Sequence, residues 1–141
     1  MVQVRHLLEA KGHVVHTARP DETVLVALQR MAEHHIGALL VIGDGDLLGV
    51  ISERDYARKV VLKGRSSRET PIGEVMALPV TVTPEAGVEE CMALCTERRV
   101  RHLPVIADGV IVGVVSIGDL VKAVIDEQTQ QIEHLQRYIA G

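Results

Sequence analysis

The sequence contains the same segment twice. When residues 17–55 are moved forward without a gap, they align with residues 81–119, and thirteen positions are identical. Most of the other aligned pairs keep their apolar or polar character. Each copy with its flanks has only about 60 residues, near the lower limit for an isolated stable domain. We therefore expect the two copies to pack face to face about a pseudo-twofold axis, so that any cleft between them is built twice.

The composition indicates a globular chain with an aliphatic core. Of its 141 residues, 47% are hydrophobic, Phe and Trp are absent, and the net charge is -4. An acidic chain argues against a dedicated nucleic-acid-binding protein, because phosphate backbones need a basic face. No apolar run approaches the roughly 20 residues of a membrane span, and Met1 to His16 lacks the pattern of a signal peptide. With Cys91 and Cys95 too few for a disulfide framework, we expect a cytoplasmic protein that binds neither membrane nor nucleic acid.

Hydrophobic periodicity and turn residues predict the order of the elements. In the first copy we expect a strand, a helix, two strands and a helix, at 14–18, 20–34, 38–42, 47–51 and 52–61. In the second copy the corresponding ranges are 79–82, 87–98, 103–106, 110–115 and 117 to about 138. A short helix at 4–10 precedes the first copy, and a polar linker at 62–70 with a helical turn at 71–76 joins the two.

The predicted final helix continues beyond the repeat and carries an apolar stripe at helical spacing. Its members are Val121, Val124, Ile125, Ile132, Leu135 and Ile139. Such a stripe either packs on the chain's own domain or covers a second copy of the chain. The length of the extension favours the second interpretation, and we expect a homodimer.

Particular stretches of both copies resemble the CBS domain, the module named after cystathionine β-synthase. They read GALLVI (37–42) and LLGVISERD (47–55) in the first copy, and RHLPVI (101–106) and VGVVSIGDL (112–120) in the second. The tandem pair, over about residues 12–125, is similar to a Bateman module and to small stand-alone bacterial CBS-pair proteins. The resemblance implies an α/β (α+β) fold of two β-α-β-β-α repeats with pseudo-twofold symmetry, an N-terminal helix and a long C-terminal helix.

The resemblance also sets the expected domain boundaries. They are an N-terminal helix at 1–12, repeat one at 13–62, a linker with a short helix at 63–76, repeat two at 77–124 and a C-terminal helix extension at 125–141.

The motif most able to bind a ligand is Gly-h-h-Ser-x-x-Asp, where h is apolar. It occupies residues 49–55 and 113–119, where a predicted strand leads into a predicted helix. A helix start has free N–H groups and a partial positive charge, which suit a phosphate. Ser52 and Ser116 can donate to phosphate, Asp55 and Asp119 can accept hydrogen bonds from ribose hydroxyls, and the glycine lets a ligand approach the backbone.

A purely structural alternative exists for the same motif. Ser-x-x-Asp before an apolar run is close to a helix capping box, and a cap would also recur in both copies. The family resemblance favours a ligand site, because in CBS domains the Asp binds ribose and the Ser or Thr lies near phosphate.

In related CBS pairs, the two residues before the buried strand often contact phosphate. Here these are Arg101 and His102 in the second copy, against Gly37 and Ala38 in the first. We therefore expect the second copy to hold phosphate more strongly. Arg54, inside the first motif, is the candidate cation of the first copy.

Adenine is expected in the apolar cleft beside the first strand of each copy. The weaker candidates for contacting it are Val15, His16, Thr17, Val80, Thr81 and Val82.

The functional hypothesis is a sensor that binds AMP, ADP, ATP or NAD as a regulatory ligand. It acts through dimerisation or on an effector protein that the sequence does not identify. We expect no catalytic activity, no required cofactor and no metal site. The alternative is a structural dimerisation module whose sites stay empty and whose terminal helices carry the function.

Overall fold

The computed structural model describes residues 1–140 and divides into two compact units. The first-repeat unit contains residues 14–79, and the second-repeat unit contains residues 1–13 together with residues 80–140. Each unit has its own core of buried aliphatic side chains. The N-terminal segment therefore folds with the second copy of the repeat, although it precedes the first copy in the sequence.

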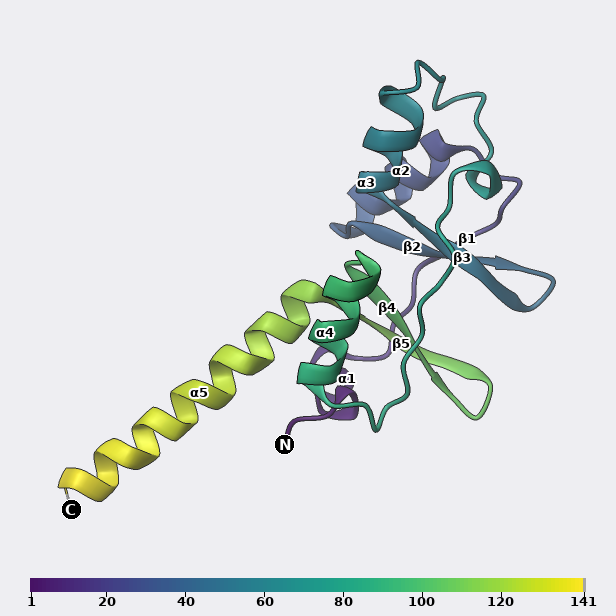
Figure 1. Cartoon of the computed structure of the whole chain (residues 1–141). Helices are drawn as coiled ribbons and strands as arrows, with labels where there is room; N and C mark the ends of the chain where they lie inside the picture. The colour runs from purple at the N-terminus through teal and green to yellow at the C-terminus, as the bar shows by residue number, and fades with distance from the viewer. Residues whose placement is uncertain (141) are drawn as a thin grey trace. The chain divides into compact units, whose positions relative to one another are not determined.

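The first-repeat unit is built on a three-stranded sheet (Figure 1). In chain order its elements are β1 (Thr17–Ala18), α2 (Val24–His34), β2 (Ala38–Gly43), β3 (Asp46–Ser52), α3 (Glu53–Asp55), the π-helix η1 (Tyr56–Val61) and the 3-10 helix η2 (Ile72–Glu74). β1 pairs in parallel with β2, and β2 pairs antiparallel with β3. The predicted order of strand, helix, two strands and helix is confirmed, with π-helical geometry in the second half of the last helix.

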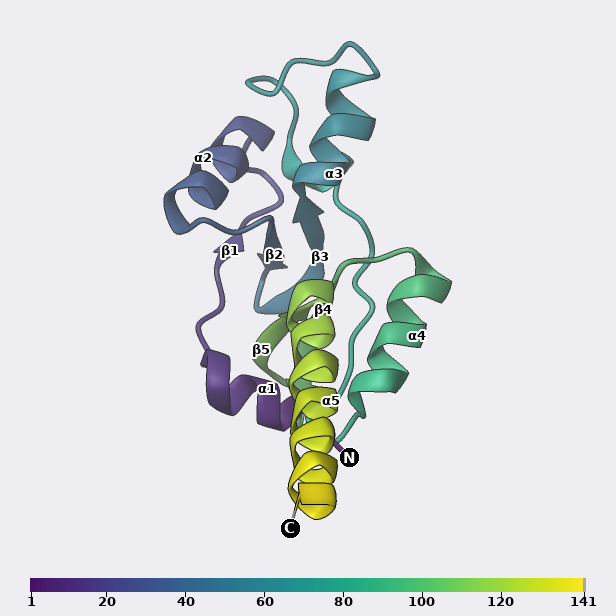
Figure 2. The same ribbon diagram turned by 90° about the vertical axis from the view of Figure 1, so that its left-hand side faces the viewer.

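The second-repeat unit keeps the helix, the hairpin and the closing helix, and adds the N-terminal helix. Its elements are α1 (Val4–Lys11), α4 (Val88–Arg98), β4 (His102–Ala107), β5 (Val110–Ser116) and α5 (Ile117–Ala140). β4 and β5 form an antiparallel pair. Figure 2 shows α1 and α4 flanking the first turns of α5, and both helices contact it.

The first strand of each copy is shorter than predicted. β1 has two residues, and the Leu40 N–H extends its pairing by donating to the His16 carbonyl at 3.1 Å. In the second copy the strand predicted at 79–82 is reduced to one parallel bridge at Val82. Pro104 aligns with Leu40 and has no N–H, so the second copy lacks the hydrogen bond that extends the pairing in the first.

Equivalent turns of the two copies share unusual backbone angles. The C-cap residues that follow α2 and α4, His35 and Arg99, both have the left-handed conformation, with φ of 55° and 56°. In the hairpins Asp44 and Asp108 have φ of 51° and 50°, and the glycine after each also has positive φ. Two positive φ angles in succession are the signature of an Asp-Gly hairpin turn, so the tight turns predicted from the sequence are confirmed.

Two glycines let a covering segment pack directly on a strand. A Cβ at Gly49 would lie 2.6 Å from the Ala77 carbonyl oxygen, and a Cβ at Gly113 would lie 2.6 Å from Leu8 Cδ2. Packing of the chain's own segments therefore accounts for both glycines, because those segments fill the space that a side chain would occupy. Leu8 belongs to α1, so α1 packs on β5, whereas the residues around Ala77 form an antiparallel bridge with β3 at Val50.

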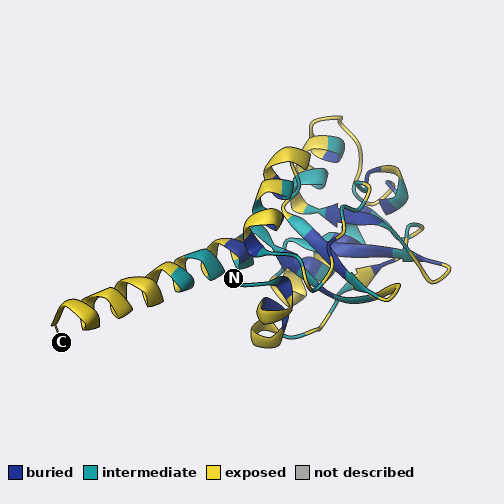
Figure 3. Ribbon diagram, turned by 60° about the horizontal axis from the view of Figure 1, so that its bottom comes forward, coloured by how far each residue is buried: buried dark blue, intermediate teal, exposed yellow. Residues whose placement is uncertain are grey.

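The final helix reaches beyond the body of its own unit (Figure 1). Leu120 is buried and Val124 packs against the core, whereas every residue from 128 to 140 is exposed (Figure 3). The apolar stripe is therefore mostly exposed: Val124 packs on the unit, whereas Val121 and Ile125 are 40% and 55% exposed. Ile132, Leu135 and Ile139 have exposed fractions of 55%, 58% and 82%.

Candidate functional site

In the first-repeat unit, the Ser-x-x-Asp motif forms a closed set of hydrogen bonds. The Asp55 N–H donates to Ser52 Oγ at 3.2 Å, and Asp55 Oδ2 accepts from the N–H and the hydroxyl of Ser52, both at 2.9 Å. Asp55 Oδ1 pairs with Lys59 Nζ at 3.1 Å, and this ammonium also donates to the Val75 carbonyl at 3.0 Å. The Asp55 side chain, 13% exposed, is a shielded and oriented carboxylate.

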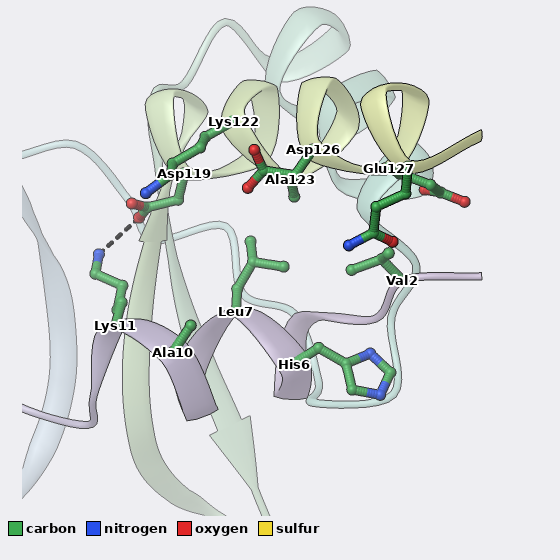
Figure 4. A pocket seen from close by; sticks show the side chains of 11 residues that line it. Val2, His6, Leu7, Ala10, Lys11, Asp119, Lys122, Ala123, Asp126 and Glu127 are labelled. Carbon is green, nitrogen blue, oxygen red and sulfur yellow. Dashed lines mark hydrogen bonds and ion pairs between the residues drawn. The ribbon is translucent and has the colours of Figure 1, made fainter. Parts of the chain in front are cut away.

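The second-repeat unit builds the same arrangement with a lysine from a distant segment (Figure 4). The Ser116 N–H donates to Asp119 Oδ2 at 2.8 Å, and the Asp119 N–H donates to Ser116 Oγ at 3.2 Å. Lys11, at the end of α1, donates to Asp119 Oδ2 at 2.6 Å and to the Val114 carbonyl at 3.0 Å. The Asp119 side chain is 27% exposed.

Opposing effects act on the pKa of Asp119. Burial is the largest single effect and raises the pKa, because it disfavours the charged carboxylate. Hydrogen bonds from Lys11 and from the Ser116 backbone, with the charge of Lys11, together outweigh burial and hold the pKa below its ordinary value. Asp119 is therefore ionised at neutral pH and can accept hydrogen bonds from a ligand.

Both motifs have the hydrogen bonds of a helix cap, as the structural alternative predicts. The first helical N–H, of Glu53 or Ile117, donates to a backbone carbonyl at 3.1 or 2.9 Å, and the third donates to the motif serine. Only the second N–H, of Arg54 or Gly118, lacks an acceptor within residues 1–140. The helix starts thus offer a phosphate fewer N–H groups than the sequence suggests.

The strand residues predicted to contact phosphate lie beside the motif serines. His102 on β4 is the register partner of Ser116 on β5, and Ala38 on β2 is the partner of Ser52. Arg101 precedes His102, is exposed, and offers its carbonyl to the first N–H of α5. The backbone of Arg101 and His102 therefore lies beside the start of α5.

Arg54 and the adenine candidates have differing surroundings. Arg54 is half-buried within α3, and Val15, His16 and Val80 are also half-buried, whereas Thr17 and Thr81 are exposed. The Val82 side chain is 8% exposed and belongs to the hydrophobic core of its unit.

His16 has an aromatic neighbour that the sequence did not reveal. Its ring stacks on that of His34 with centroids 3.9 Å apart. Burial, and then the charge of His34, lower the pKa of His16. One face of the His16 ring, a candidate for contacting adenine, is thus covered by another imidazole.

Two lysines at the candidate site were missed by the sequence analysis. Lys59 follows Asp55 by one helical turn, so the spacing of an i, i+4 ion pair could have identified it. Lys11 lies 108 positions from Asp119 and outside the repeat, so no local pattern connects them. Only the packing of α1 on its unit brings the pair together.

A groove of about 420 Å³ runs between α1 and α5 and has Asp119 on its wall (Figure 4). Leu7, Ala10 and Ala123 supply apolar lining, and Lys11 and Lys122 supply positive charge near the carboxylate. Figure 4 shows the Lys11 and Lys122 side chains reaching toward Asp119 from opposite helices.

Metal binding and thiol reactivity, two other kinds of chemistry, depend on how the side chains of residues 1–140 are grouped. No group of three or more His, Cys, Asp or Glu residues there is arranged to hold a metal ion. Cys91 and Cys95 lie buried in the core, where burial is the main reason that the pKa of Cys91 rises to about 11. Within the same residues, none of the helices has the length and apolar character that crossing a bilayer requires.

Comparison with known proteins identifies the family. The model of the CBS domain matches residues 11–62 and 72–126. The mitochondrial CBS domain-containing protein CBSX3 of Arabidopsis thaliana is 45% identical over 127 residues, which are 86% of this chain and 62% of that protein. The chain thus spans less than two thirds of this relative.

Solved structures agree with this match. A CBS-domain protein of Burkholderia ambifaria MC40-6 is 46% identical, with a TM-score of 0.85 and coverage of 90% of this chain and 96% of that one. The hexameric CBS-CP12 protein from bloom-forming cyanobacteria is 30% identical, with a TM-score of 0.77 and coverage of 86% and 70%.

Proposed function

The chain belongs to the CBS-domain family, and we propose that it is a regulatory module that binds an adenosine nucleotide without chemical turnover. The ligand is AMP, ADP, ATP or NAD, which share adenosine and phosphate. Asp55 and Asp119 accept the ribose hydroxyls, and Arg101, His102 and Arg54 serve the phosphates. Binding is relayed through a change in oligomeric state or through an effector protein.

One observation carries this proposal: both repeats hold an ionisable Asp in the same oriented and shielded position. In each, a backbone N–H of the motif serine donates to Asp Oδ2, at 2.9 Å for Asp55 and 2.8 Å for Asp119. A carboxylate fixed in this way accepts O–H donors without first having to be ordered. A helix cap alone needs only a short polar side chain, and does not require a lysine to be bound at the carboxylate as well.

A second candidate function, a structural dimerisation module, is favoured by α5. Its outer apolar residues are exposed, and an exposed stripe on a long helix is typical of a helix that packs on a partner. The hexameric state stated for the cyanobacterial CBS-CP12 protein supports assembly as a property of related chains. In our proposal, α5 packs on a second copy, and the nucleotide alters that assembly only as far as its affinity differs between the two states.

Calorimetric titration of the full chain with AMP, ADP, ATP and NAD tests nucleotide binding. Losing charge-assisted hydrogen bonds to ribose costs at least about tenfold in affinity, so Asp119→Asn should weaken binding by that factor or more. Asp126→Asn is the matched control, because it makes the same charge change further along the same exposed helix; its affinity should stay within about twofold. If wild-type protein binds none of the four nucleotides, the sensor function is refuted and the dimerisation module remains.

Thermal shift separates a helix cap from a phosphate site. Ser116→Ala should lower stability by about 1 kcal/mol, the usual value of a cap. Arg101→Ala leaves the cap intact but should reduce the stabilisation that nucleotide provides. If nucleotide stabilises wild type and Arg101→Ala equally, the phosphate role of Arg101 is wrong.

Sedimentation of the full chain tests the role of α5. A dimer in wild type and a monomer after Leu135→Lys is the expected pair of results, because a charge in an apolar contact between helices is costly to bury. Gln130→Lys is the control, because Gln130 is exposed on the same segment and lies on the face of α5 opposite the stripe. A monomeric wild type would refute self-association through α5.

A further inference from the structure

The two motif carboxylates differ in what a ligand must displace. Each carboxylate oxygen accepts about two hydrogen bonds. Asp119 Oδ2 already accepts two, from the Ser116 N–H at 2.8 Å and from Lys11 Nζ at 2.6 Å. The first donor belongs to the backbone at the start of α5 and cannot swing away. A sugar that uses both oxygens of Asp119 for its two adjacent hydroxyls therefore competes directly with Lys11.

Asp55 can accept the same diol without losing its lysine. Its Oδ1 is paired with Lys59 alone, which leaves a second acceptor position. Its Oδ2 accepts from the N–H and the hydroxyl of Ser52. That hydroxyl rotates freely about its C–O bond and can give up its place to a ribose hydroxyl.

Lys11 also connects the carboxylate to a separate segment of chain. It is the last residue of α1, and Gly12 ends the helix with φ of 98°. The beginning of α1 is held by buried Val4 and by the backbone bond from its N–H to the Ala86 carbonyl at 2.9 Å. Leu8 is buried, and beyond it the last turn of α1 is held by polar contacts: those of Lys11 with Asp119 and the Val114 carbonyl, and that of the His13 ring with the Val112 carbonyl at 2.7 Å.

We propose that Lys11 is a displaceable counter-ion, so that a ribose diol binding at Asp119 releases the C-terminal end of α1 from its unit, whereas binding at Asp55 leaves Lys59 in place. This inference rests on the proposed nucleotide function and adds to it a direction of signalling. Nucleotide binding at repeat two changes the contacts of α1, whereas nucleotide binding at repeat one leaves those contacts unchanged. The groove between α1 and α5, with Asp119 on its wall, is where the released lysine side chain moves.

Affinity measurements on separated sites test the competition. AMP is the probe, because it is the part common to all four candidate nucleotides. In an Asp55→Asn background only repeat two keeps its motif carboxylate, and Lys11→Met should tighten AMP binding about two- to fivefold, the range of a partly exposed ion pair. Lys122→Met is the matched control, because it removes the same charge near Asp119 without an ion pair to it (Figure 4). Its effect should stay below about twofold.

The equivalent experiment in repeat one should give a different result. In an Asp119→Asn background, Lys59→Met should change AMP affinity by less than about twofold, since Lys59 does not have to leave. Equal tightening by Lys11→Met and Lys122→Met would mean that net charge alone is responsible, and would overturn the proposal. Unchanged or weaker binding in Lys11→Met would also overturn it.

Hydrogen exchange on wild-type protein provides a readout that needs no variant. The Gly12 N–H donates to the Leu8 carbonyl at 2.7 Å and reports the last turn of α1. AMP should speed its exchange about tenfold, and 2′,3′-dideoxy-AMP, which lacks the diol, should not. Binding of AMP that depends on Asp119 but leaves this exchange unchanged overturns the counter-ion role alone. Absence of AMP binding in wild type and in all variants overturns the proposed function with it.

Discussion

Replacing Gly49 by alanine tests whether the motif glycine serves packing or ligand binding. The added Cβ would lie 2.6 Å from the Ala77 carbonyl oxygen and 2.8 Å from Met76 Sδ. Ordinary contact begins at 3.4 Å, so the covering segment must retreat by about 0.8 Å. The same segment exchanges two backbone hydrogen bonds with Val50, both 2.9 Å long, and the retreat weakens them.

The expected loss follows from these contacts. Overpacking of a well-packed site costs about 1–3 kcal/mol, and a rigid carbonyl oxygen places Gly49→Ala at the upper end. Alanine restricts the unfolded chain and returns about 0.4–1 kcal/mol. We expect a net loss of about 2 kcal/mol, or roughly 6 °C in Tm for a chain of this size. Gly113→Ala should lose about 1 kcal/mol or less, because it meets the end of the Leu8 side chain and not a backbone atom.

Thermal and urea unfolding without ligand provide the assay. Gly118→Ala is the control, because its Cβ meets nothing closer than Ser116 Oγ at 3.6 Å and alanine favours the helix. Its stability should be unchanged or raised by up to about 1 kcal/mol. If the unfolding curves of Gly49→Ala and wild type coincide, and the variant binds nucleotide more weakly, the packing argument is refuted and the glycine serves ligand binding.

Further predictions concern charge and reactivity. The pKa of Asp119 is lower in the folded protein, so the unfolded state binds more protons and the free energy of unfolding should fall as the pH drops below about 4. In unfolding experiments at a series of pH values, Asp119→Asn should flatten that decline. An equally steep decline in the variant would contradict the assignment. Ser116→Ala should retain near-native exchange in the rest of its unit while losing about 1 kcal/mol, and a global loss of structure would exclude a simple cap. Proton NMR should find the pKa of His16 below its ordinary value, and the protein should lose stability as the pH falls through this lowered pKa. His34→Gln should raise the pKa of His16 only partly, because burial is the larger cause. A return of the pKa to its ordinary value in this variant would assign the whole effect to His34. Cys91, buried with a pKa of about 11, should react with a thiol reagent at pH 8 only as fast as the unit unfolds, so rapid labelling of the folded protein would refute its burial.

Local patterns were sufficient to predict most elements of the fold. The Asp-Gly turns, the helices α2 and α4, and the length of α5 followed from turn chemistry and 3.6-residue periodicity. These features depend on residues that are close in sequence, so the same patterns predicted them in both copies. The prediction of a first strand at 79–82 in the second copy was wrong, because the length of such a strand depends on its pairing partner. Pro104 is remote from 79–82 in sequence, and it lacks the N–H that this pairing needs.

The candidate site was predicted in its local part only. The serine and aspartate of each motif lie three residues apart, so their mutual hydrogen bonds follow from helix geometry. The lysine bound to each aspartate differs in origin. Lys59 follows from the one-turn spacing, whereas Lys11 comes from a helix that precedes the other repeat.

The duplicated sequence by itself determined the order of the elements, the hairpin turns and the pairing of serine with aspartate, because a three- or four-residue separation fixes such contacts through backbone geometry alone. Tertiary structure decided which segment covers each copy. The N-terminal helix packs on the second copy because Gly113 leaves room for Leu8 to reach the strand, and this packing carries Lys11 to Asp119. Contacts between residues so far apart depend on which apolar faces are buried together, and no pattern within either segment specifies that choice.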